Sequence, residues 1–218
     1  MKNNYIKYYD ITIKKVNIPQ NIITRIFLSK FSPIKRNFNN KKILDFSCGS
    51  GPYLNFLKSL GFKVYASEIS KIIISKLKKK FNKIKFIVSN NKKINLSNNE
   101  LDFFLAVHSL YYLNKKDENL DLIIDEILRV LKKDGYLICT FLKKNQKYLK
   151  FKKKGKHLYK IIYDKYKIRK NSYFHLFNNK KQIVKYFSKK FKVIEIGEYQ
   201  SKLKNFEENY FIFILKKK

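Results

Sequence analysis

A run of small and acidic residues begins at position 45 of the sequence. Asp45 lies in a short apolar segment, and Ser47, Gly49 and Gly51 follow it at every second position. A glycine turn between a buried strand and a helix lets a ligand approach bare backbone near the helix N-terminus. A plain β-α turn would use the same glycines, so the spacing alone leaves both interpretations open. Leu54 stands where the dinucleotide pattern G-x-G-x-x-G has its third glycine, which disfavours an oxidoreductase.

The elements that would position this turn alternate between strands and helices. The predicted strands are 42–47, 62–68, 83–89, 101–107, 135–141, 191–199 and 209–217, and the predicted helices are about 52–60, 71–80, 117–131 and 179–189. The continuous apolar strand cores predict a sheet that is buried on both faces, as parallel sheets require. Helical crossovers then give a doubly wound α/β fold. The turn between the last two strands is too short for a crossover, so that pair must be antiparallel.

The glycine turn resembles the first motif of class I S-adenosylmethionine-dependent methyltransferases of the type 11 and 12 kind. That motif, D/E-x-G-x-G-x-G, is matched by Asp45, Ser47, Gly49 and Gly51, with Ser47 in place of the first glycine. The resemblance covers about residues 40–142 and the closing antiparallel pair. It implies a Rossmann-like fold with a mostly parallel seven-stranded sheet, and S-adenosyl-L-methionine as the cofactor.

Further positions carry the same resemblance. Glu68, followed by Ile69, ends the second strand, where the family has an acid that accepts both ribose hydroxyls. As an alternative, Glu68 is an acid favoured by the dipole of the next helix. Asn90 stands where the family commonly has an Asp that binds the adenine amino group. Val107 ends the fourth strand, at the edge where open α/β sheets bind ligands. The cofactor-binding residues implied are therefore Asp45, Ser47, Gly49, Gly51, Glu68, Ile69, Asn90 and Val107.

His108 is the first choice for a general base. Methyl transfer needs an aligned nucleophile, and a proton acceptor if the nucleophile starts neutral, and it requires no metal. His108 would lie at a strand end beside the donor and can titrate near neutral pH, although a histidine there can also simply pack against the donor. Tyr111, Tyr112 and His175 are candidates for the acceptor pocket. The alternative for these three is ordinary packing in the core or in a loop.

The chain divides into two parts. Residues 1–40 are predicted to form an N-terminal helical lid, whose tyrosines at 5, 8 and 9 could close over the methionine end of the donor. Residues 41–218 are predicted to form one domain, because 218 residues with 44% hydrophobic content bury one ordinary core. The resemblance implies that this is a class I methyltransferase domain. A basic insertion on the substrate side interrupts this domain at about 143–175.

The charge is strongly positive, with Lys+Arg 50 against Asp+Glu 16 and a formal net charge of +34. Such an excess often indicates nucleic-acid binding. The excess is nearly all Lys, and Gly and Pro are scarce, which an AT-rich genome would also produce, so net charge does not decide the partner. Cys48 and Cys139 supply neither a disulfide framework nor a zinc site. With no apolar run long enough to span a membrane, we expect a soluble, cytoplasmic protein.

Three functions remain open. Compact size and the lack of an added RNA-binding domain favour methyl transfer to an O or N atom of a small molecule. The basic segment 143–170 favours RNA, in particular tRNA, because cations contact phosphates and aromatic rings stack on bases. The tyrosines of that segment are Tyr148, Tyr159, Tyr163 and Tyr166. The CGSGPYL and YFHLF stretches also resemble tRNA wobble-uridine methyltransferases. A catalytically silent donor-binding protein is the third alternative, suggested only by Ser47 and Asn90.

Overall fold

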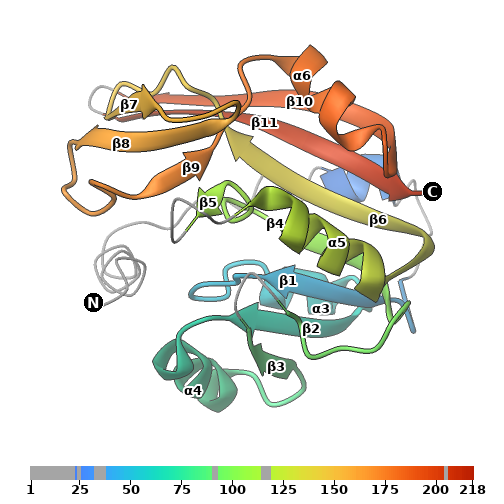
Figure 1. Ribbon diagram of the computed structural model, residues 1–218. Helices are drawn as coiled ribbons and strands as arrows, with labels where there is room; N and C mark the ends of the chain where they lie inside the picture. The colour runs from blue at the N-terminus through green and yellow to red at the C-terminus, as the bar shows by residue number, and fades with distance from the viewer. Residues whose placement is uncertain (1–22, 24–25, 32–37, 90–92, 114–118, 204–205) are drawn as a thin grey trace.

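A seven-stranded sheet forms the centre of the molecule (Figure 1). The computed structural model describes residues 23, 26–31, 38–89, 93–113, 119–203 and 206–218. The strand order is β10-β11-β6-β4-β1-β2-β3. The strands of this sheet are β1 (Lys42–Phe46), β2 (Lys63–Glu68), β3 (Lys85–Val88), β4 (Leu101–Ala106), β6 (Leu131–Leu142), β10 (Phe191–Leu203) and β11 (Phe206–Lys217). β3, β2, β1, β4 and β6 are parallel, whereas β11 is antiparallel to both of its neighbours.

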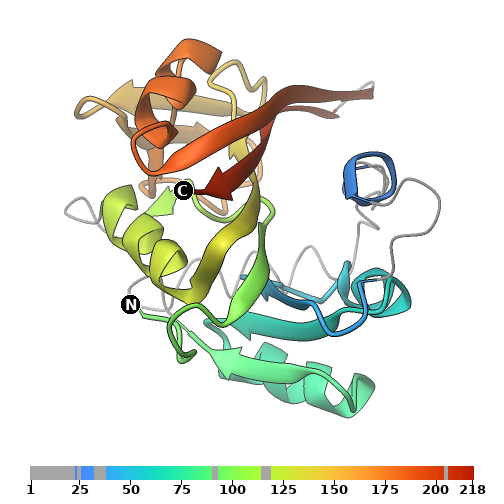
Figure 2. The same cartoon turned by 90° about the vertical axis from the view of Figure 1, so that its right-hand side faces the viewer.

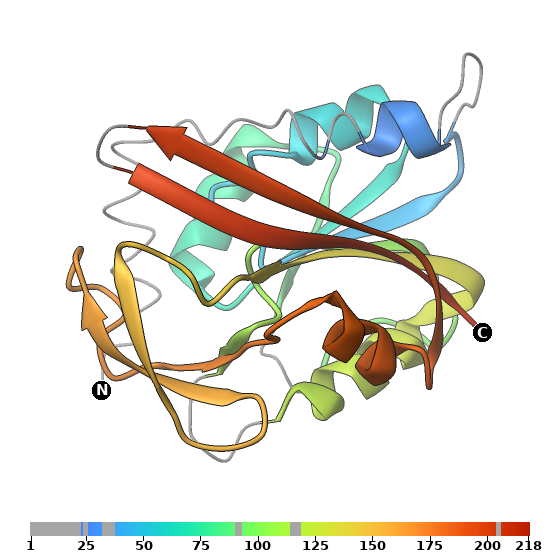
Figure 3. The same cartoon turned by 90° about the horizontal axis from the view of Figure 1, so that it is seen from above.

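Helices cover both faces of this sheet. The helices are α3 (Leu54–Ser59), α4 (Lys71–Lys80), α5 (Leu120–Val130) and α6 (Lys180–Phe187), together with the π-helix η1 (Phe27–Phe31). Buried residues of η1, α3 and α4, such as Phe27, Leu54 and Leu77, belong to one hydrophobic cluster, and the buried residues of α5 and α6 belong to another. Figure 3 shows α5 and α6 on one side of the strands and η1 and α3 on the other. The predicted doubly wound α/β fold with a closing antiparallel pair is confirmed.

Local sequence explains where the longer helices begin. The side chain of Asn119 accepts from Asp121 N at the start of α5, and that of Ser70 accepts from Ile73 N at the start of α4. Such caps satisfy backbone donors that the first helical turn leaves without partners. The apolar face of α5 then buries residues at helical spacing against the sheet: Leu120, Ile123, Ile124, Ile127 and Val130.

A second, four-stranded antiparallel sheet is built largely from the predicted insertion. Its strand order is β5-β9-β8-β7, with β5 (Tyr112–Leu113), β7 (Leu149–Lys153), β8 (Leu158–Asp164) and β9 (Tyr173–His175). Figures 1 and 2 show this small sheet to one side of the main sheet, close to α6. Asp164 is buried at the end of β8 and accepts from the backbone N–H groups of Tyr166, Ile168 and Arg169. The one acid of the basic insertion therefore anchors the loop that leads to β9.

The described part of the predicted lid packs against the body of the domain. Phe27 contacts Phe62, which precedes β2, and Phe103, early in β4. These positions are near the amino ends of the strands, opposite the carboxyl edge where a ligand is expected. The tyrosines at 5, 8 and 9 lie outside the described residues, so their role as a lid stays a prediction. None of the helices in the described ranges is long and apolar enough to cross a membrane.

Candidate functional site

The glycine turn after β1 is held in a left-handed backbone conformation. Ser47, Gly49 and Gly51 have φ of 54°, 53° and 76°. The turn is fixed by hydrogen bonds from Cys48 N to Ser67 O (2.9 Å) and from Gly51 N to Cys48 O (2.9 Å). A Cβ on Gly51 would lie 2.6 Å from Leu54 Cδ1, so only glycine lets the turn pack this closely on α3. The turn is therefore specified by both conformation and space.

Glu68 ties this turn to the end of β2. Its Oε2 accepts from Gly49 N at 3.1 Å, and its Oε1 accepts from Ile69 N at 2.9 Å and from Ser70 N at 3.2 Å. Burial raises the pKa of Glu68, while these three N–H donors act to lower it. A carboxylate has about four acceptor positions, so Glu68 retains capacity for a further hydroxyl donor.

Asp45 lies beside Glu68 with one oxygen unsatisfied. Its side chain is 2% exposed, and its Oδ2 has no hydrogen-bond partner among the residues that the structure describes. Burial, and then the charge of Glu68, raise the pKa of Asp45 to about 8. Two buried carboxyls this close repel each other when both are ionised, and a cation between them would relieve the repulsion. The pair fits a ligand that carries positive charge and hydroxyl groups.

His108 lies at the carboxyl end of β4, as predicted, but in a restricted setting. Its φ is 53°, its N donates to Thr140 Oγ1 at 2.7 Å, and its Nδ1 is 3.3 Å from the same oxygen. Its ring centroid is 4.2 Å from that of Tyr210. Burial, and then the positive charge of Arg169, lower the pKa of His108 to about 4. His108 is therefore a neutral, weakly basic imidazole at physiological pH.

Glu208 is a residue of this region that sequence reasoning missed. Tyr210 Oη donates to Glu208 Oε1 at 3.1 Å, which connects Glu208 through Tyr210 to the ring of His108. Burial, and then the charges of Asp45 and Glu208, raise the pKa of the Tyr53 hydroxyl. Tyr53 therefore lies within electrostatic reach of both carboxyls, and Glu208 is near the glycine turn. Burial raises the pKa of Glu208, with Tyr210 and Arg169 acting in the opposite direction.

The structure gives fewer contacts for three other residues that are predicted to bind the cofactor. Val107 follows β4 directly and packs, partly buried, against the cluster that contains α3. Ile69 follows Glu68 and is 36% exposed, so it presents apolar surface at the same edge. Asn90 lies outside the described residues, and its contact with adenine stays a prediction.

Tyr111, Tyr112 and His175 come together in the small sheet. Tyr111 is 2% exposed and packs against Phe174, and its ring stacks on Tyr112 at 4.7 Å. His175 N donates to Tyr111 O at 2.8 Å. The His175 side chain faces a cavity of its own, beside His157 and Tyr186. Tyr111 therefore packs in the core, and the three side chains do not share one pocket wall.

The tyrosines of the basic insertion divide into two kinds. Tyr148 and Tyr159 are buried in the core, which removes them from any base-stacking surface. Tyr163 and Tyr166 are 47% and 40% exposed, and Lys150 Nζ lies 5.7 Å from the ring centroid of Tyr163. Only the second pair could stack on a nucleotide.

The sequence and the fold both match methyltransferases. Residues 44–139 match the sequence model of a family described as a methyltransferase domain. Comparison with curated proteins gives no match.

Solved structures with a similar fold extend over almost the whole chain. One is the 1,6-didemethyltoxoflavin-N1-methyltransferase of Burkholderia thailandensis, with bound 1,6-didemethyltoxoflavin and S-adenosylhomocysteine. It is 10% identical, with a TM-score of 0.70 over 98% of this chain and 85% of that one. A SAM-dependent methyltransferase from Aquifex aeolicus is 18% identical, with a TM-score of 0.63 over 95% and 98% of the two chains. The [4+2]-cyclase SpnF is also similar, at 16% identity and a TM-score of 0.58 over 82% and 75%. At these identities the likeness shows the fold, which does not by itself determine the reaction.

Proposed function

We propose that this protein, a class I S-adenosylmethionine-dependent methyltransferase through its domain at residues 44–139, transfers the methyl group to an oxygen or nitrogen atom of a small molecule. The observation that carries the proposal is the pair of buried acids at the glycine turn. Glu68 keeps acceptor capacity and Asp45 keeps an unsatisfied oxygen, and both lie at the carboxyl edge of the parallel strands. A nucleoside with a positively charged tail matches both requirements.

Roles for the residues at this edge follow from their chemistry. Glu68 would accept from a ribose hydroxyl, and Asp45 from the amino group of the methionine end. Gly49 and Gly51 keep the backbone bare for close approach, and Ser47 continues the same turn. Ile69 and Val107 offer apolar contacts for the adenine ring, with Asn90 as the predicted partner of its amino group.

Bound S-adenosylmethionine supplies a methyl group on a positively charged sulfur, which any aligned nucleophile can attack. The chain must therefore align the acceptor and remove its proton. His108 and Glu208 are the two candidates for the proton acceptor. The pKa of His108 is lowered to about 4, which makes it a poor base, whereas burial raises the pKa of Glu208. We assign the base to Glu208, and to His108 the role of positioning Tyr210 through their ring contact.

A small-molecule acceptor is supported by the extent of the structural likeness. The toxoflavin methyltransferase aligns over 98% of this chain. The alignment therefore includes much of the basic insertion. Because a small-molecule enzyme aligns with this segment, the insertion does not by itself indicate an RNA methyltransferase.

A second candidate, an RNA acceptor, is favoured by one observation. Tyr163 and Tyr166 are exposed on a lysine-rich surface, and such rings can stack on unpaired bases.

A calorimetric titration with S-adenosylhomocysteine, repeated with total tRNA, tests this proposal. Binding of the nucleoside without tRNA affinity at physiological salt supports a small-molecule acceptor. Binding of both, with methyl transfer to tRNA, moves the acceptor to RNA. Binding of neither contradicts the assignment of the donor site, and binding without transfer to any metabolite or RNA favours the silent alternative.

A further inference from the structure

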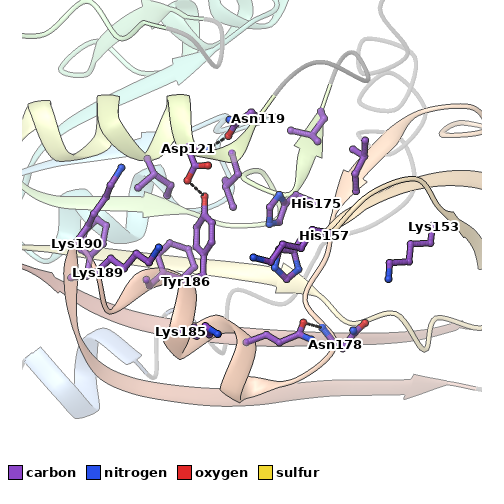
Figure 4. Close-up of a pocket in the computed structure, with 18 residues that line it drawn as sticks. Asn119, Asp121, Lys153, His157, His175, Asn178, Lys185, Tyr186, Lys189 and Lys190 are labelled. Atoms are coloured by element: carbon purple, nitrogen blue, oxygen red, sulfur yellow. Dashed lines mark hydrogen bonds between the residues drawn. The ribbon is translucent and has the colours of Figure 1, made fainter.

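A cavity of about 750 Å³ lies apart from the glycine turn, between α5, α6 and the turn that joins β7 to β8 (Figure 4). Its apolar floor is formed by side chains such as Leu120, Ile124 and Phe187. This volume is typical of pockets that hold a whole small molecule. We call this cavity the basic pocket.

Lysines from three segments surround the basic pocket. They are Lys153 from β7, Lys156 from the following turn, and Lys185, Lys189 and Lys190 from α6 and the residues after it. Lys190 pairs with Asp125, but the other four have no ion pair within the part of the chain that the structure describes. Asp121 is the one acid on the wall, and it accepts from Tyr186 Oη. The pocket therefore carries positive charge that the described residues leave uncompensated.

Two of the chain's three histidines also face this cavity. The rings of His157 and His175 stack with centroids 5.2 Å apart, and Figure 4 shows them side by side at its centre. His175 Nε2 is buried and has no hydrogen-bond partner among the described residues. Burial, and then the neighbouring His157, lower the pKa of His175 to about 3, so its ring is neutral at physiological pH. A neutral imidazole can still donate one N–H to an anion.

The charges of two of these lysines affect the pKa of His157. Burial lowers the pKa of His157, and the charges of Lys156 and Lys153 lower it further. Lys153 and Lys156 therefore lie within electrostatic reach of His157. Asn119, Asn178 and Gln182 add neutral amide groups to the wall.

A lysine-rich composition alone does not produce this arrangement. The lysines at the end of α4, such as Lys78 and Lys79, are exposed on an open helix face. Lys153, Lys156, Lys185 and Lys189 are also exposed, but they line one cavity together with two histidines and three neutral amide groups. An anion with several acceptor oxygens satisfies both kinds of group, as charge-assisted hydrogen bonds to phosphate do elsewhere.

We propose that the basic pocket binds the phosphate group of a small phosphorylated molecule. The apolar floor and the buried Nε2 of His175 favour a compact ligand that enters the cavity over a nucleic-acid backbone, because proteins hold single strands in open grooves that follow the chain. The inference does not depend on the proposed methyl transfer, since none of the residues of the glycine turn lines this cavity.

Histidine NMR on the full-length protein, titrated with inorganic phosphate and with pyrophosphate, tests the inference. A bound anion favours the charged imidazole, so pyrophosphate should raise the pKa of His157 and His175. His108, which does not line the cavity, should not change and serves as the internal control. Shifts of all three histidines by the same amount would show a general salt effect and overturn the proposal.

Matched lysine variants provide the second measurement. The double variant Lys185→Ala and Lys189→Ala should weaken pyrophosphate binding by about tenfold or more, as loss of charge-assisted bonds does. The control double variant Lys78→Ala and Lys79→Ala removes the same charge from α4 and should bind like the parent protein. Equal losses in both variants would mean that only net charge matters. Displacement of pyrophosphate by single-stranded RNA but not by phosphate monoesters would replace the small ligand with RNA. Binding of S-adenosylhomocysteine by both variants shows that the donor site is intact.

Discussion

The glycine-turn edge and the basic pocket bury opposite kinds of charge. At the edge, Asp45 and Glu68 are buried carboxyls with raised pKa values. In the basic pocket, burial lowers the pKa values of the imidazoles of His157 and His175. In both places, burial penalises the charged form of a group until a ligand of opposite charge arrives. Each region should therefore be selective for the sign of its ligand, and the two should respond to mutation independently.

The largest expected effect comes from closing the glycine turn. In Gly51→Ala, the new Cβ would lie 2.6 Å from Leu54 Cδ1, and the residue would keep a φ of 76° that costs a non-glycine residue about 1–2 kcal/mol. We expect affinity for S-adenosylhomocysteine, measured by calorimetry, to fall by about 100-fold or more, which is about 2.7 kcal/mol. Binding of pyrophosphate to the basic pocket should stay unchanged.

The matched control for this variant is Gly197→Ala. A Cβ on Gly197 meets nothing within 4 Å, so stability should change by no more than about 0.5 kcal/mol and donor affinity should not change. If Gly51→Ala binds the donor as well as Gly197→Ala does, the ligand does not use this turn.

The next effect separates the two candidate bases. Replacing Glu208 with Gln keeps the shape and the bond to Tyr210 but removes the base, so the methyl-transfer rate should fall by about 100-fold or more. Because burial raises the pKa of Glu208, the parent rate should decline as the pH falls through a value above the ordinary pKa of 4.5 for glutamate. The Glu208→Gln variant should lose this decline.

The matched comparison is His108→Gln. If His108 were the base, the rate would decline only near pH 4, where its ring becomes protonated, and the Glu208 variant would keep that profile. Retention of the full pH profile in Glu208→Gln, with its loss in His108→Gln, would return the proton transfer to His108.

A smaller effect is expected in the small sheet, at Asp164. This buried carboxylate accepts three backbone N–H bonds in the loop before β9. Asp164→Asn removes the charge that strengthens those bonds, so we expect the protein to lose about 1–3 kcal/mol of stability. Hydrogen exchange should locate the loss in residues 164–175. A loss spread equally over β1 and β2 would mean that the two sheets unfold together.

Local patterns made the parallel half of the chain predictable. The strand that contains Asp45, the glycines after it and Glu68 at the end of the next strand are adjacent in sequence, and the helix predicted at 71–80 is α4 (Lys71–Lys80). For the small sheet, the sequence predicts only a basic insertion on the substrate side. The first part of β8 does alternate, since Tyr159 and Ile161 are buried, but the dense lysines obscure this period of two in the sequence.

The functional candidates missed by sequence reasoning depend on tertiary contacts. Glu208 lies far along the chain from Tyr53 and His108, and only the pairing of β11 with β6 brings it to the same edge. The walls of the basic pocket come from α5, α6, β7 and β9. No spacing in the sequence indicates that such distant segments meet.

The smallest expected effect tests whether the fold fixes the backbone conformation of the glycine turn at Ser47. Ser47 has a φ of 54°, in the region that favours glycine, so Ser47→Gly should relieve strain and stabilise the protein by about 0.5–1 kcal/mol. For a chain of this size that corresponds to a rise of about 1–4 °C in Tm, measured by calorimetry. Ser188 is the matched control, because its φ of −61° is right-handed and Ser188→Gly should lower Tm. Equal changes at the two serines would mean that the backbone of the turn adapts to its residues. Opposite changes would mean that the fold imposes this conformation on Ser47 before any ligand binds.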